Sequence, residues 1–109
     1  MPKKYLSMLG MARRAGKLSM GHDIAMNSLR NHKANLIIFA SDVSERLIKE
    51  FNCACEKFYP DLQVVRIDET IDEIQFVLGY KAGVITVDDN NFSGRIKELI
   101  IQEENVYGN

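Results

Sequence analysis

Apolar and polar positions alternate along the chain with two different periods, and each period predicts its own kind of element. Compact apolar runs predict buried strands at 36–40, 63–67 and 83–87, and residues 17–20 predict a short edge strand. Apolar residues three or four positions apart predict helices over 3–14 and 22–31, a third helix ending at Phe58, a fourth ending at Leu78, and a last helix after residue 90. Strands and helices therefore alternate along the whole sequence.

Local signals predict where several of these helices begin and end. Pro2 suits a helix start, Gly16 suits a stop, and Asp42 or Ser44 is expected to cap the third helix. Residues 70–73 (Thr-Ile-Asp-Glu) form a capping box, and Gly79 should end the helix that it opens. Residues 88–90 should cap the last helix, and the polar tail 102–109 is expected to fray.

This alternation predicts the α/β class, as a three-layer α/β/α sandwich around a small mixed four-stranded sheet. The core strands are expected to be largely parallel, with 36–40 and 83–87 as parallel neighbours. No repeat or linker divides the chain, so residues 1–109 are expected to form a single domain. The residues expected to be buried are Leu36, Ile38, Phe39, Phe51, Val65, Ile85 and Phe92.

The stretch 16–27, just before the most apolar strand, is the best candidate for a functional surface. Gly21 can adopt the backbone angles needed where a helix begins. On the helix that follows, Asp23 and Asn27 form a polar row that Arg30 or Asn31 extends. The opposite row, expected to be buried, contains Ile24, Ala25, Ser28 and Leu29. A helix N-terminus with a polar row beside it suits phosphate oxygens.

Charge is distributed unevenly, although the net charge is only −1. Residues 1–35 carry seven basic residues against Asp23 alone, whereas the remainder carries seven basic and 14 acidic residues. The basic end is either a phosphate-binding patch or a solvated face whose charges scatter on folding. The sequence contains no apolar run of membrane-spanning length and no apolar signal segment, which favours a cytoplasmic protein that does not bind membranes.

Residues that could carry metal or redox chemistry have simpler explanations. Cys53 and Cys55 diverge on a helix, with Cys55 on its core stripe. His22 and His32 lack metal-ligand spacing, although His22 could touch a ligand. A third set, Asp42, Asp88 and Asp89, follows two predicted strands and could hold a divalent metal as in receiver or phosphatase-like domains, but helix capping is favoured. We therefore expect no metal and no cofactor.

Several motifs resemble one known family over nearly the whole chain. The most specific motif is Leu-Gly-Met-Ala-Arg-Arg-Ala-Gly-Lys-Leu at 9–18, followed by Gly21 and by the strand with its Ala-Ser-Asp end at 36–42. Gly79 and residues 87–92 (Val-Asp-Asp-Asn-Asn-Phe) continue the match. Together they resemble the bacterial branch of the kink-turn-binding ribosomal-protein family, which includes the large-subunit proteins seven-Ae and thirty-e.

The resemblance implies the same sandwich fold and RNA binding without enzymatic activity. In the family, an Asn-Glu pair and a Lys three residues later read the sheared G·A pairs of a kink-turn; here Asp23, Ile24 and Asn27 occupy these positions. A loop corresponding to residues 79–83 covers the bent RNA backbone. Asp23 cannot donate as an amide does, Ile24 cannot hydrogen-bond, and Asn27 carries no charge, so weak kink-turn binding is predicted.

The predicted protein is therefore a cytoplasmic monomer that binds structured RNA of the kink-turn type, with ribosomal RNA among the candidates. One alternative is a protein-interaction module that keeps the fold without tight RNA binding, and the other is a metal-dependent receiver or phosphatase-like domain that uses Asp42, Asp88 and Asp89. The residues predicted to contact RNA are Arg13, Arg14, Lys17, Gly21, His22, Asp23, Ile24, Asn27, Tyr80 and Lys81.

Overall fold

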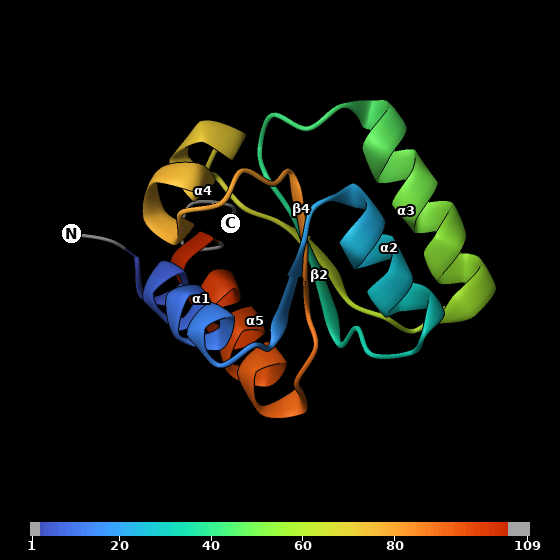
Figure 1. Ribbon diagram of the computed structural model, residues 1–109, viewed down its shortest axis with the longest axis horizontal. Helices are drawn as coiled ribbons and strands as arrows, with labels where there is room; N and C mark the ends of the chain where they lie inside the picture. Colours follow the sequence, from blue (N-terminus) through green and yellow to red (C-terminus); the bar gives the residue numbers. More distant parts are fainter. Residues whose placement is uncertain (1–2, 105–109) are drawn as a thin grey trace.

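A computed structural model describes residues 3–104 and places a four-stranded sheet between two layers of helices (Figure 1). Within this range the helices are α1 (Lys4–Arg14), α2 (His22–Arg30), α3 (Glu45–Phe58), α4 (Ile71–Leu78) and α5 (Asn90–Glu104). The strands are β1 (Leu18–Met20), β2 (Leu36–Phe39), β3 (Val64–Arg66) and β4 (Val84–Val87). Helices α2 and α3 lie on one side of the sheet, and α1, α4 and α5 lie on the other (Figure 1). The predicted three-layer sandwich is confirmed.

The sheet is mixed, as predicted, but one expected strand direction is wrong. Its order is β1-β4-β2-β3, and β4 runs antiparallel to both of its neighbours while β2 and β3 are parallel. Leu36 lies opposite Val87 and Phe39 lies opposite Val84, so the strands expected to be parallel neighbours are antiparallel neighbours. The reason is that the connection through α4 leaves β3 and enters β4 at the same end of the sheet.

The core contains most of the residues that the apolar pattern placed there. Leu36, Ile38, Phe39, Phe51 and Ile85 are at most 2% exposed. Two others, Val65 and Phe92, are only partly buried against this core. Val65 belongs to an edge strand and Phe92 to the first turn of α5, and such positions are covered on fewer sides.

Most helix ends follow the predicted local signals. Ser44, not Asp42, caps α3, and its side chain accepts a hydrogen bond from the Leu47 amide. The capping box at Thr70 and Glu73 is formed, and Gly79 ends α4 with a left-handed φ of 77°. Residues 102–104 of the tail expected to fray continue α5, whereas Pro2 and residues 105–109 lie outside the described residues.

The two cysteines diverge as expected. Cys53 is exposed and Cys55 is buried in the core, where burial raises the pKa of its thiol. Neither thiol is in a disulfide. Within the described part of the chain, no helix is both long enough and apolar enough to cross a membrane.

Candidate nucleic-acid interface

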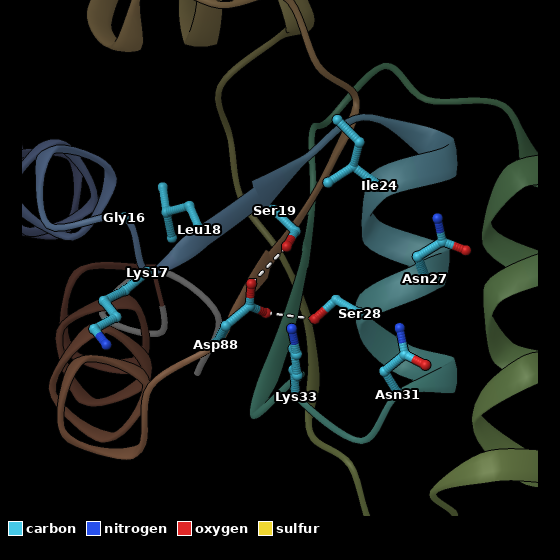
Figure 2. A pocket seen from close by; sticks show the side chains of 10 residues that line it. All are labelled: Gly16, Lys17, Leu18, Ser19, Ile24, Asn27, Ser28, Asn31, Lys33 and Asp88. Carbon is cyan, nitrogen blue, oxygen red and sulfur yellow. Dashed lines mark hydrogen bonds between the residues drawn. The ribbon is translucent and has the colours of Figure 1, made fainter.

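An open depression runs between β1 and α2, and we call it the α2 depression (Figure 2). Its volume of about 450 Å³ falls in the range of ligand sites, but it is a partly open depression and not an enclosed cavity. Helix α2 contributes Ile24 and Asn27, and Asn31 follows as its C-cap residue. These three residues share one side because they are spaced i, i+3, i+7. The complete lining is Gly16, Lys17, Leu18, Ser19, Ile24, Asn27, Ser28, Asn31, Lys33 and Asp88.

The prediction that residue 24 faces the core is wrong. Its side chain is 53% exposed, whereas Ala25, Ser28 and Leu29 of the same predicted row are buried. Met26, which the prediction missed, is buried too. The helix packs on the sheet through these residues, and position 24 lies at the margin of that stripe, beside the short edge strand β1. Residue 24 therefore faces the depression.

A carboxylate holds the floor of the α2 depression together. Asp88 accepts hydrogen bonds from the hydroxyls of Ser28 at 2.6 Å, Thr86 at 2.8 Å and Ser19 (Figure 2 shows the bonds to Ser19 and Ser28). These hydroxyls come from β1, α2 and β4, so one side chain connects three elements. The Asp88 amide also donates to the Lys17 carbonyl at 2.8 Å. We call this arrangement the Asp88 network.

Two lysines supply positive charge to the α2 depression. In Figure 2, Lys33 lies at the lower end of the depression between Asp88 and Asn31, and Lys17 lies at the left, next to Gly16. Backbone hydrogen bonds fix both lysine positions, because the Lys17 amide donates to the Ala12 carbonyl and the Lys33 amide to the Ser28 carbonyl, each at 2.9 Å. Positive side chains on an anchored backbone beside amide groups form a surface suited to phosphate and base edges.

A second depression lies on the other flank of the same helix. It is lined by His22, Asp23, Met26, Asn27, Arg30 and Glu50, so Asn27 borders both depressions. His22 bridges α2 and α3, with Nδ1 2.8 Å from an Asp23 oxygen and Nε2 2.8 Å from a Glu50 oxygen. Its ring also meets Phe51 edge to face, with centroids 5.6 Å apart. The hydrogen bond to Asp23, followed by that to Glu50, raises the pKa of His22 above its ordinary value.

This raised pKa predicts that stability depends on pH through His22. Because the folded state holds the proton more tightly than the unfolded state, the stabilisation is complete below the unfolded pKa of about 6.5 and is lost as pH rises through the folded pKa. The effect should be small, since the side chain is 45% exposed. Urea unfolding of the parent and of His22→Gln on both sides of this window measures it. The parent should lose more stability than the variant as pH rises, and equal losses would contradict the prediction.

The loop before β4 lies near the start of α2. The Gly21 amide donates to the Val84 carbonyl at 2.9 Å, which holds the beginning of α2 against the first residue of β4, directly after this loop. Gly21 has a φ of 99°, a conformation that favours glycine. Tyr80 and Lys81 are both exposed in the loop, but neither lines the α2 depression.

The structure thus brings together only part of the predicted set. Lys17, Ile24 and Asn27 share the α2 depression, while His22 and Asp23 face the second one. Arg13 and Arg14 are exposed in the last turn of α1 and line neither depression. The sequence analysis did not select Lys33, which lines the α2 depression. The spacing of seven residues between Ile24 and Asn31 could have shown that both lie on the same side of the helix.

The alternative metal site is contradicted by strand direction. Because β2 and β4 are antiparallel, Asp42 after β2 and Asp88 after β4 lie at opposite ends of the sheet. Asp89 caps α5 by accepting from the Phe92 amide at 2.9 Å, as expected for a cap. Asp42 accepts from the Ile71 amide at the start of α4, so it caps a different helix from the one predicted. Among residues 3–104, no cluster of three or more His, Cys, Asp or Glu side chains could hold a metal ion.

Known proteins similar to this chain include two bacterial relatives. The chain is 27% identical over 105 residues to the RNA-binding protein YlxQ of Enterococcus faecium, covering 90% of this chain and 92% of that protein. It is 26% identical over 102 residues to the RNA-binding protein YlxQ of Bacillus subtilis strain 168, covering 89% and 95%. This similarity confirms the bacterial branch that the motifs indicated.

Solved structures and a family profile complete the comparison. A Bacillus halodurans protein of unknown function superposes with a TM-score of 0.82 at 27% identity, covering 91% of this chain and 98% of that one. The 15.5 kD RNA-binding protein of Giardia lamblia gives a TM-score of 0.70 at 16% identity, covering 91% and 83%, which shows a shared fold. A sequence profile matches residues 3–72, more than half of the chain, which therefore belongs to the ribosomal protein L7Ae/L30e/S12e/Gadd45 family.

Proposed function

We propose that this protein is a non-enzymatic RNA-binding protein that contacts structured RNA through the α2 depression. Family membership and the RNA-binding names of both bacterial relatives support RNA binding. The observation that carries the proposal is the lining of the α2 depression, where two lysines and two asparagines share one open surface beside the C-terminal half of α2 and the residues that follow it. Lysines attract phosphate, and amide groups can both donate to and accept from base edges.

The RNA is proposed to be of the kink-turn type, contacted with modest preference over a plain duplex. Ile24 and Asn27 face the α2 depression, so they are placed to meet a base, but Ile24 offers only an apolar contact. Asp23 faces the second depression, where its carboxylate is held by His22. The exposed loop residues Tyr80 and Lys81 would flank the RNA near the start of α2. Ribosomal RNA as the target, a monomeric state and a cytoplasmic location belong to the same proposal.

The first test measures how strongly the lysines attract RNA phosphates independently of sequence. We expect Lys17→Ala and Lys33→Ala each to weaken binding to a kink-turn RNA and to a plain duplex by similar factors. Each change should also reduce the slope of log K against log salt by roughly one unit. Arg13→Ala and Arg14→Ala are expected to act in the same way from the end of α1. Fluorescence anisotropy at several salt concentrations gives both the affinity and the slope.

A matched control is available on the neighbouring helix. Lys49 is exposed on α3 and lines a separate depression with Arg46, Glu50 and Cys53. Lys49→Ala therefore removes the same charge without touching the α2 depression. If Lys17→Ala and Lys33→Ala changed the affinity and the salt slope no more than Lys49→Ala does, the α2 depression would not be the phosphate-contacting surface.

A further inference from the structure

A second exposed surface lies between α1 and α4, on the other side of the sheet from α2 and α3 (Figure 1). It is a shallow groove of about 280 Å³, which we call the α4 groove. Phe76 and Val77 project from α4 and are 90% and 41% exposed. The groove is lined by Leu6, Glu69, Asp72, Glu73, Phe76 and Val77.

Phe76 and Val77 do not belong to the hydrophobic core, whereas Leu6 at the base of the groove does. Helix α4 packs through Ile74 and Leu78, which are spaced i, i+4 and are both buried. Phe76 lies midway between them in sequence and therefore points to a different side of the helix. A polar residue at this exposed position would be equally compatible with folding. An almost fully exposed Phe beside exposed Val77 is the kind of apolar surface that marks an interaction site.

The charges around the α4 groove decide between classes of partner. Its described lining contains three acidic residues, Glu69, Asp72 and Glu73, and no basic one. Glu69 is only 8% exposed and is already bound by Lys3 at 3.3 Å and by the Tyr5 hydroxyl. Asp72 and Glu73 are exposed and are therefore the acidic residues that a partner can reach. Acidic side chains repel phosphate, so this surface does not suit nucleic acid. They attract a basic partner and would orient it.

We propose that the α4 groove docks an amphipathic basic segment of a protein partner, with apolar side chains packed on Phe76 and Val77 and Lys or Arg side chains facing the acidic residues. The proposal goes beyond RNA binding and does not depend on it. Because the α4 groove and the α2 depression lie on different layers of the sandwich, both can be occupied at once. The protein would then connect a structured RNA to a basic protein segment.

The test is a titration of the ¹⁵N-labelled full chain with a synthetic helical peptide of about 15 residues, built from Leu on one face and Lys on the other. Amide shifts should map to Leu6, Asp72 and Val77. Phe76→Ser should weaken binding roughly tenfold or more, since exposed aromatic anchors carry much of the energy of such contacts. Glu73→Gln, which keeps an oxygen for the capping box, should weaken it less. A peptide with Glu in place of each Lys should not bind, and Lys17→Ala should leave the titration unchanged.

Several results would overturn the proposal. Equal binding by Phe76→Ser, or shifts that map to α2 and α3, would mean that the groove is not the docking surface. Concentration-dependent shifts of the same residues without peptide would assign the groove to a second copy of the chain. Peptide binding seen only with a chain that ends at Glu104 would mean that residues 105–109 are the natural occupant of the groove. Shifts at Phe76 on adding plain duplex RNA would assign it to RNA instead.

Discussion

The triple variant Asp23→Asn, Ile24→Glu, Asn27→Lys is expected to prefer a kink-turn over a plain duplex far more strongly than the parent does. These changes restore the residue types that the family resemblance places at the three reading positions. A well-paired base contact gives about 1–3 kcal/mol of discrimination, so restoring one or two should raise the preference roughly tenfold to several-hundredfold. Gel shifts with both RNAs measure it, and a thermal melt of each protein shows that the fold is kept.

The structure makes this variant a practical one. Ile24 is 53% exposed and lines the α2 depression, so a Glu there would not be forced into the core. An Asn at position 23 can still accept the hydrogen bond that His22 now gives to Asp23. The three changes add one net positive charge. The control is Asn52→Lys, which adds the same charge at an exposed position of α3, away from the site. If the triple variant gained no more than Asn52→Lys, the transfer of family roles to these positions would be wrong.

Helix ends and apolar stripes could be predicted because their signals are local. Thr70 and Glu73 form a capping box within four residues, and Gly79 adopts the left-handed conformation a few positions later. The stripe of α3 buries Phe51 and Cys55 four residues apart, as its period requires. Such features depend on neighbours along the chain, and a sequence contains that information directly.

Strand direction and the margins of a buried stripe depend on elements far away in sequence. The apolar pattern of residues 36–39 and 84–87 does not indicate whether the two strands run parallel or antiparallel. Their relative direction depends on the end of the sheet at which the chain enters β4 after α4. Ile24 was misplaced for a related reason. Helical periodicity finds the centre of a stripe, but whether its margin is covered depends on the width of the sheet beneath, which here ends at the three-residue strand β1.

The candidate site shows the same division. Lys17 and Asn27 could be predicted because a basic segment and a helical row are visible locally. The Asp88 network could not, because Ser19 and Ser28 lie 69 and 60 residues away from Asp88 in sequence. Local reasoning offered Asp88 as a metal ligand or as part of a helix cap, and its actual role appears only once three elements are brought together.

Removing the Asp88 carboxylate is expected to produce the largest loss of stability among the polar substitutions considered. Asp88→Ala deprives three hydroxyls of their acceptor, and Ser28 and Thr86 are buried at 4% and 0% exposure. Hydrogen bonds to a charged group are worth about 1.5–3 kcal/mol each, but the losses are not additive, because a hydroxyl can rotate to a backbone carbonyl. We expect the free energy of unfolding to fall by about 2–4 kcal/mol. Urea denaturation at constant pH measures the change.

The neighbouring residue provides the matched control. Asp89→Ala removes the same group from the next position but breaks only the cap on the Phe92 amide, which should cost about 1 kcal/mol. Asp88→Asn keeps one acceptor oxygen and should fall between the two, because its amide can also donate to a hydroxyl oxygen. Ser28→Ala in the Asp88→Ala background should then cost less than in the parent, since the bond is already lost. Equal losses for Asp88→Ala and Asp89→Ala would show that the Asp88 network adds nothing to the backbone pairing and packing that hold β1 and α2 to β4.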